Sequence, residues 1–251
     1  MTARSVAGGI GIAALLLLCP FSRAQVYPRW FLNPEEIPCE PAAIGVAPTG
    51  YYPDSTGGAF QNAVMNALRA EEEAVEGSKQ FFSAGDGTAE VGTSVHETLD
   101  TSRLESLFKS LKTVRMFAIG EMTAVLAGTG GCGLSGGMDA LVPLASLGTP
   151  AWTRMLPADQ RFEYAVGISE PYYYESSSWL EAEKNGRLEL ARSLRTQVRI
   201  RQRLVTDAVL GSRYDAVWDE TLTVTLRGAR VVRRWRDPST DLFMVLLRMP
   251  K

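Results

Sequence analysis

The residue best suited to acid–base chemistry near neutral pH is His96, the single histidine of the chain. An imidazole base in a nucleophilic triad or a metal site needs partners at defined positions, and the sequence alone does not place them. Its counterpart in the internal repeat described below is Asp219, a residue that caps helices well. We therefore interpret His96 as a polar helix start and expect no catalytic role for it.

Two short motifs resemble sites of known chemistry. Residues 131–136 read Gly-Cys-Gly-Leu-Ser-Gly, which fits G-x-G-x-x-G, but a dinucleotide site needs this string between the first strand and helix of a βαβ unit. Asp54 begins Asp-Ser-Thr-Gly, similar to an aspartic-protease turn, yet no second facing carboxylate is evident. We interpret these motifs as a linker and a turn, and we expect no enzyme, no cofactor and no metal site.

Charged residues cluster in two places. Glu71, Glu72, Glu73 and Glu76 are expected on the solvated face of the first helix, with calcium binding as a weaker alternative, since consecutive helical positions point apart. In the second cluster arginines alternate with apolar residues, which indicates a strand with an arginine face toward water or a partner. These arginines are Arg199, Arg201 and Arg203. The net charge of −2 disfavours nucleic acid as that partner.

Tyrosines follow the first expected strand in both halves of the chain. They are Tyr51, Tyr52, Tyr172, Tyr173 and Tyr174. Tyrosine gives a large contact area with a polar tip at little entropic cost, so we predict that these loops bind a partner or ligand. The alternative is that they cover the edge of a sheet.

The elements that position these residues occur twice. Pro28-Arg29-Trp30 recurs as Pro150-Ala151-Trp152, and AIGVA at 43–47 recurs as AVGIS at 165–169, both 122 residues later. Further matching segments follow in the same order in both halves, including HETL at 96–99 and DETL at 219–222. Collinear matches of this kind predict a duplicated domain.

Each copy is predicted to be an α+β domain of order β-α-β-(α)-β-β, with one helical layer on a mainly antiparallel sheet. Ala59 and Ala63 would let the first helix lie close to its sheet. The 219–226 segment alternates like a strand, but its counterpart at 104–111 has helical spacing, so we favour a short helix in both. The copies span residues 25–127 and 150–251, joined by a Gly-rich linker at 128–149.

The N-terminal segment predicts export. Arg4 precedes an apolar run at 6–18 that is too short to span a bilayer, and small residues precede an expected signal-peptide cleavage between Ala24 and Gln25. An uncleaved anchor is the alternative. Lipidation of Cys19 is disfavoured because Leu18, not a small residue, comes before it.

Removal of residues 1–24 leaves Cys39 and Cys132. In an oxidising compartment we expect them to form a disulfide that ties together the ends of the first copy. Two unrelated buried thiols are the alternative.

Charge is divided unequally between the copies. Residues 25–137 carry 7 basic and 14 acidic residues, and residues 151–251 carry 17 and 13. The net charges of −7 and +4 suggest attraction between copies, within a chain or head-to-tail between chains. Drift of surface residues after duplication would produce the same asymmetry.

The chain resembles the Lpp-twenty envelope lipoprotein family, which includes flagellum-associated outer-membrane lipoproteins. The resemblance rests on the Pro-x-Trp segment, the strand with a central glycine, the Ala-rich helix and a terminal pair reading VVRRWRDPSTDLFMVLLRM. It implies a compact dodecin-like or related domain, a location in the cell envelope, self-association and no catalysis.

Together these features predict a non-enzymatic, exported cell-envelope protein of the periplasm or cell surface that acts as a structural or assembly module. Its expected partners are itself or other envelope proteins, with membrane association only through a partner or an uncleaved or lipidated N-terminus. The alternative is a periplasmic binding module that holds a small molecule or glycan between the copies.

Overall fold

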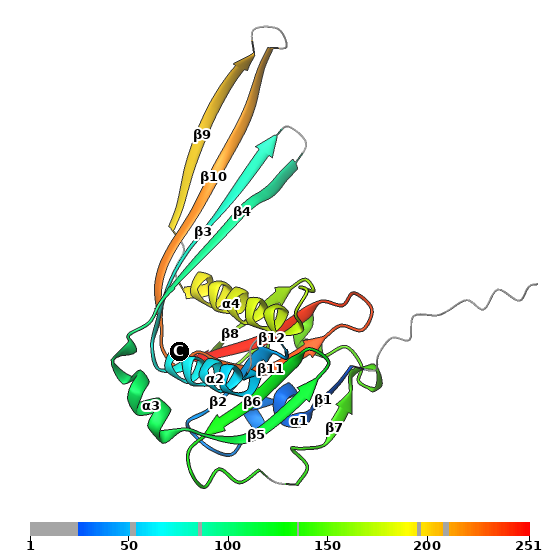
Figure 1. The fold of residues 1–251 in the computed structure, drawn as a ribbon. Coiled ribbons are helices and arrows are strands. Elements are labelled where there is room, and N and C mark those ends of the chain that lie inside the picture. Colours follow the sequence, from blue (N-terminus) through cyan, green and yellow to red (C-terminus); the bar gives the residue numbers. More distant parts are fainter. Residues whose placement is uncertain (1–24, 51–53, 85–86, 135, 195–196, 208–210) are drawn as a thin grey trace, which may run out of the picture.

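The computed structural model describes residues 25–50, 54–84, 87–134, 136–194, 197–207 and 211–251. Within these ranges the protein is an α+β structure with four α-helices and four antiparallel sheets. Figure 1 shows a body made of two three-stranded sheets and their helices, from which two long β-hairpins project together.

The first half of the body is a three-stranded sheet of order β2-β6-β5 with helix α2 packed on it. Asp54 caps α2, because its carboxylate accepts a hydrogen bond from the backbone N–H of Gly57 at 2.7 Å. All seven residues of β6 are buried, as expected for a central strand covered on both faces. The elements are β2 (Ala42–Pro48), α2 (Ser55–Glu71), α3 (Leu104–Ser110), β5 (Lys112–Ile119) and β6 (Met122–Gly128).

The second half repeats this arrangement, with sheet order β11-β12-β8 and helix α4 packed on it. In both halves the strand that follows the long hairpin (β5 or β11) is an outer strand of its sheet. The last strand of each half (β6 or β12) is the central one. The predicted terminal pair is confirmed, with its turn at Asp237. The elements are β8 (Phe162–Ser169), α4 (Glu175–Leu194), β11 (Arg230–Arg236) and β12 (Phe243–Pro250).

One glycine in each half lets the helix approach its sheet closely. A Cβ added at Gly45 would lie 2.1 Å from the carbonyl oxygen of Ala59, and one added at Gly167 would lie 1.9 Å from that of Ala182. Such contacts are impossible for a real side chain, so both positions require glycine. The close approach that the small residues of α2 predict is therefore confirmed.

Four long strands form the projecting sheet, in the order β4-β3-β10-β9. Each half contributes one hairpin, and β3 pairs with β10 to join them. At about 3.3 Å per residue, the longest strand extends roughly 50 Å. The strands are β3 (Glu73–Ala84), β4 (Gly87–Thr98), β9 (Gln197–Asp207) and β10 (Gly211–Leu226).

The segments before and between the halves pack together. Strand β1 pairs with β7, and Tyr27, Trp30, Phe31 and Leu144 join the main apolar cluster, which includes residues of both sheets and α4. The segment expected to be a linker thus contributes buried residues to the core. The elements are β1 (Val26–Pro28), α1 (Arg29–Leu32), β7 (Leu141–Pro143) and the 3-10 turns Pro34–Glu36, Leu144–Ser146 and Ala151–Thr153; a further 3-10 turn, Thr101–Arg103, precedes α3 in the first half.

Three local expectations are wrong. The 219–226 segment is part of strand β10, and His96 lies within strand β4 instead of starting a helix. The acidic run also does not lie along one helix, because α2 ends at Glu71 and Glu73 is a fully buried residue of β3. In each case cross-strand pairing within the long hairpins overrides the local pattern.

Candidate functional site

Ion pairs join the two halves, and they have a single polarity. Among the residues whose side chains the structure describes, which leaves out 79–93 and 195–222, every ion pair of this kind takes its arginine from the second half and its glutamate from the first half or from the segment before it. The pairs are Arg187 with Glu73 and Glu97, Arg227 with Glu72, Arg230 with Glu40, Arg233 with Glu35 and Glu36, and Arg248 with Glu35. The attraction that the charge asymmetry predicts therefore operates within the chain.

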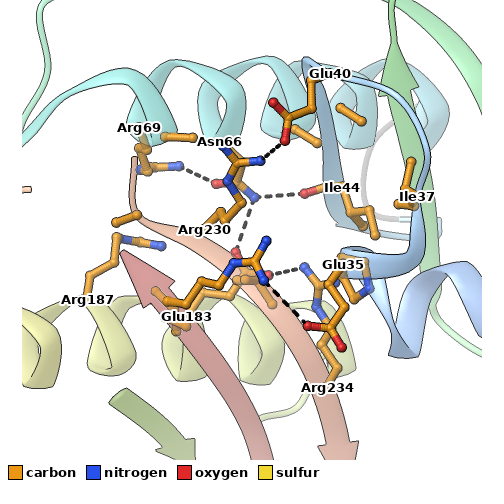
Figure 2. Close-up of a pocket in the computed structure, with 18 of the residues that line it drawn as sticks. Glu35, Ile37, Glu40, Ile44, Asn66, Arg69, Glu183, Arg187, Arg230 and Arg234 are labelled. Carbon is orange, nitrogen blue, oxygen red and sulfur yellow. Dashed lines mark hydrogen bonds and ion pairs between the residues drawn. The ribbon is translucent and has the colours of Figure 1, made fainter. Parts of the chain in front are cut away.

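The best-buried pair of this region is formed by Glu183 of α4 and Arg234 of β11, 2.6 Å apart. Arg234 also donates to the carbonyl oxygen of Phe31 at 3.1 Å and lies over the Phe31 ring. From the first half, the side-chain amide of Asn66 in α2 donates to the carboxylate of Glu183 and to the carbonyl oxygen of Ile44. Figure 2 shows these side chains converging from α2, α4 and the C-terminal strands.

The same side chains line a cavity of about 100 Å³ between the halves. The lining has five arginines and three glutamates, and each of the arginines is paired with a glutamate in or beside the lining. Because these arginines already have carboxylate partners, the cavity does not need a bound anion to neutralise their charge. We conclude that this region is a structural joint between the halves.

Glu73 is the least solvated acid of the joint. Its carboxylate lies near Arg69 and Arg187, at 3.3 and 3.2 Å, and the acid Glu97 is close to the same arginines. Burial raises the pKa of Glu73 to about 7, because the two arginines offset only part of the desolvation and Glu97 adds repulsion.

A larger groove opens at another contact between the halves. It has a volume of about 580 Å³ and is bordered by the β5–β6 turn on one side and the loop after β8 on the other. Tyr172 and Tyr173 in that loop are 55% and 83% exposed. The half-buried Tyr174 lies edge-to-face against Tyr173, with ring centroids 4.8 Å apart. The two exposed rings give the groove an aromatic wall.

Charged groups form the floor of this groove. Tyr27 donates a hydrogen bond of 2.5 Å to Glu175, and Arg236 contacts both Glu175 and Asp241. Burial, reinforced by the neighbouring carboxylate of Glu175, raises the pKa of the Tyr27 hydroxyl well above its usual range. Tyr27 therefore stays protonated and acts as a donor, and does not act as a base.

The projecting sheet ends in two free edges. Strands β4 and β9 are outermost, and no other described strand pairs with their outer sides. An edge strand presents unpaired N–H and C=O groups that can pair with another chain. Within the described residues, the outer sides of β4 and β9 are therefore open to pairing with another chain.

The residues predicted to interact are divided among these surfaces. Tyr172 and Tyr173 line the groove, while Tyr51 and Tyr52 lie outside the described residues. The three arginines of the predicted strand, Arg199, Arg201 and Arg203, lie on the edge strand β9, where the register places Arg199 opposite Asp219 and Arg203 opposite Asp215. The expected signal cleavage at Ala24 falls outside the described residues, and Gln25 is the first of them.

The two cysteines predicted to bond are joined. Cys39 and Cys132 form a disulfide with a Cα–Cα distance of 5.4 Å, which ties the segment before β2 to the turn after β6. This turn belongs to the G-x-G-x-x-G string, which lies after the last strand of its sheet instead of between a strand and a helix. Sequence reasoning did not identify the free edges, since the 73–98 hairpin has no strong alternating pattern.

The described ranges contain neither a membrane-spanning helix nor a metal-binding cluster. No helix there is long and apolar enough to cross a membrane, and no group of three or more His, Cys, Asp or Glu side chains is arranged to hold a metal ion. In comparisons with known proteins, no family model, curated protein or solved structure matches this chain.

Proposed function

We propose that this protein is a non-enzymatic, exported cell-envelope protein that acts as a structural or assembly module. The observation that carries the proposal is the projecting four-stranded sheet, built by both halves and open at both edges. The body beneath it is braced by a disulfide and by buried ion pairs. A stiff body that presents extended pairing edges is suited to assembly.

We also propose that the two halves are tandem copies of one Lpp-twenty-like, dodecin-like domain. Both halves have the same sheet order relative to their helix, and both place a glycine of the first strand against that helix. Shared order and a shared close contact support duplication more strongly than composition does. Helix α3 would then be an insertion in the first copy.

Export through a signal peptide cleaved after Ala24 is part of the same proposal. The disulfide between Cys39 and Cys132 supports it, because disulfides persist mainly in oxidising compartments. Mass spectrometry of the N-terminus of protein secreted or exported by cells tests it. A chain that begins at Gln25 is the expected result, and a retained N-terminus would contradict cleavage.

Light scattering of the full chain at low and high salt tests the assembly proposal. We expect particles of several copies at low salt that dissociate as salt rises, because screening weakens contacts between exposed charges. A monomer at every salt and protein concentration would contradict the proposal.

The second candidate is a binding module for a small molecule or glycan held between the copies. The groove with Tyr172 and Tyr173 on its wall and Arg236 on its floor favours it, since flat aromatic faces and polar groups are common in ligand sites.

Variants of the two tyrosines separate these candidates. If the groove binds a glycan, Tyr172→Ala and Tyr173→Ala weaken retention on a glycan array and leave the solution mass unchanged. Met155→Ala removes an exposed apolar side chain away from the groove and serves as the control. Loss of self-association with unchanged glycan retention would contradict the binding-module candidate.

A further inference from the structure

We propose that the groove bordered by Tyr172 and Tyr173 binds a small organic cation, an ammonium compound that carries alkyl groups on its nitrogen. The inference rests on the second candidate function, the binding module, and names the class of its ligand. It assigns the aromatic wall to the alkyl groups and the carboxylates of the groove to the charge.

The groove has room for a ligand of this kind. Its volume of about 580 Å³ falls within the roughly 300–1,000 Å³ of typical small-molecule sites. Glu121 comes from the turn between β5 and β6, whereas the two tyrosines come from the loop after β8. A ligand in the groove therefore contacts both halves of the body, and sites between domains are common.

The charged side chains of the groove are mostly acidic. Its described lining includes three acids and one basic residue, which are Glu121, Glu175, Asp241 and Arg236. The formal charge of these four side chains is −2. A groove of that sign attracts cations and repels phosphates, sulfates and acidic sugars.

The arginine of the groove is already neutralised by the protein. Its Nε donates to Asp241 at 2.7 Å, and its Nη1 donates to Glu175 at 3.1 Å. The guanidinium also lies over the ring of Phe243, 4.6 Å from the ring centre. Two carboxylates thus share the one guanidinium of Arg236, so this cluster keeps an excess negative charge.

Two of the three carboxylates remain able to contact a ligand. The side chain of Asp241 is 45% exposed, and its Oδ1 accepts hydrogen bonds from Gln25 and Arg236. Its Oδ2 accepts none from a described residue. Glu121 is exposed and forms no ion pair with another described residue, whereas the side chain of Glu175 is only 20% exposed. We therefore expect Asp241 and Glu121 to face the charge of the ligand.

The aromatic wall selects an organic cation. The face of an aromatic ring attracts a cation that lies within about 6 Å of the ring centre, and rings of this kind recognise alkylated ammonium groups. Tyr172 and Tyr173 expose their rings at the groove that contains the acids. Alkyl groups on the nitrogen can contact these rings while the charge stays near the carboxylates.

Choline and its uncharged carbon analogue, in which a tert-butyl group replaces the trimethylammonium group, test the ligand class. The two probes have nearly the same shape and differ in charge, so their difference measures recognition of the cation. Calorimetric titration of the full chain gives the two affinities. We expect choline to bind at least about fivefold more tightly at low salt, and the difference to shrink as salt rises.

Variants of the two exposed acids locate the charge recognition. Asp241→Asn and Glu121→Gln are each expected to weaken choline binding about fivefold and to leave binding of the carbon analogue unchanged. Asparagine tolerates the positive φ of 62° at position 241, so the turn keeps its shape. Glu105→Gln changes an exposed acid of α3 outside the groove and is the matched control.

Variants of Tyr173 test the aromatic wall. Tyr173→Ala is expected to weaken choline binding about two- to fivefold, because it removes the ring. Tyr173→Phe keeps the face of the ring and is expected to retain binding. Equal losses in the two variants would contradict recognition by the ring.

The same ammonium chemistry occurs in free compounds and in lipid headgroups. Co-sedimentation with vesicles of phosphatidylcholine, compared with vesicles of phosphatidylglycerol, separates these sources. Retention on phosphatidylcholine alone would support a headgroup, and binding of choline without retention would support a free compound.

The remaining outcomes overturn specific claims. Equal affinity for the two probes, or choline binding that is unchanged in both acid variants, would overturn recognition of a cation. Retention on a glycan array without a response to choline would overturn the cation and leave the binding module standing. Absence of both would overturn the binding module as well, and the assembly proposal, which the solution mass tests, would still stand.

Discussion

Arg187 in α4 lies 3.2 Å from Glu73 at the start of β3, with side chains 9% and 0% exposed. The pair connects the second half of the body to the base of the first hairpin. Arg187 also contacts Glu97, near the end of β4, so one arginine holds both strands of that hairpin. The joint between the halves and the root of the projecting sheet are therefore the same structure.

The buried carboxyl of Glu73 predicts a pH dependence of stability. Its folded pKa of about 7 lies above the ordinary value of 4.5, so the folded state binds a proton that the unfolded state has lost between these values. The contribution of Glu73 to the free energy of unfolding is then highest below pH 4.5 and falls by up to about 3 kcal/mol as pH rises to 7. Urea unfolding across this range measures it.

Glu73→Gln is expected to remove this part of the pH dependence, since glutamine does not titrate. The neighbouring Glu72 is exposed and provides the matched control, Glu72→Gln, whose pH dependence is expected to equal that of the unsubstituted chain. Identical pH profiles for Glu73→Gln and the unsubstituted chain would contradict the assignment.

The Arg234–Glu183 pair predicts a large loss of stability when one partner is removed. Arg234→Met leaves Glu183 buried without its arginine and is expected to lower the free energy of unfolding by about 3–5 kcal/mol. Arg227→Met breaks an exposed pair with Glu72 and is expected to cost at most about 1 kcal/mol. Equal effects in urea unfolding would contradict the structural role of the buried pair.

The double variant Arg234→Met with Glu183→Met removes both charges. It is expected to recover most of the loss, because an apolar pair of similar volume leaves no uncompensated charge. A loss in the double variant equal to the sum of the single losses would contradict this.

The two strand glycines predict matched effects in the two halves. Gly45→Ala and Gly167→Ala each force a methyl group against helix backbone and are expected to lower the free energy of unfolding by about 2–3 kcal/mol. Gly133→Ala, where no atom lies within 4 Å of the added Cβ, is expected to change it by less than about 0.5 kcal/mol. Tolerance of alanine at 45 or 167 would show that the helix does not approach that strand as described.

The disulfide predicts a loss of stability on reduction. It closes a separation of 93 residues, for which the loop-entropy relation gives about 4–5 kcal/mol. The variant Cys39→Ser with Cys132→Ser and the reduced unsubstituted chain are expected to unfold at the same, lower urea concentration. Unfolding of the native chain that does not respond to a reductant would contradict the prediction.

Local patterns predicted the body well. The glycine-centred strands, the helices after them and the C-terminal strand pair all follow from the periodicity of hydrophobic residues. The disulfide between Cys39 and Cys132 was predicted because disulfides form in oxidising compartments. The short helix at 104–110 was also recognisable from its spacing. Its presence misled the interpretation of 219–226, because the second half has a strand there and no equivalent of α3.

The projecting sheet could not be predicted in the same way. Strand β3 pairs with β10, which is more than 100 residues away, and the acidic start of β3 continues the composition of α2 without a proline or glycine break. The net charges of the halves predicted attraction, but no local pattern identified which arginine meets which glutamate. Those partners depend on how the two halves pack.

Assembly of several copies is the central claim, and the solution mass of the protein tests it most directly. The solution mass is measured by light scattering across a salt series and at several protein concentrations.

We predict particles of several copies at low salt that dissociate as salt rises, because screening weakens contacts between exposed charges. The mass of a single copy at every salt and protein concentration would contradict the claim.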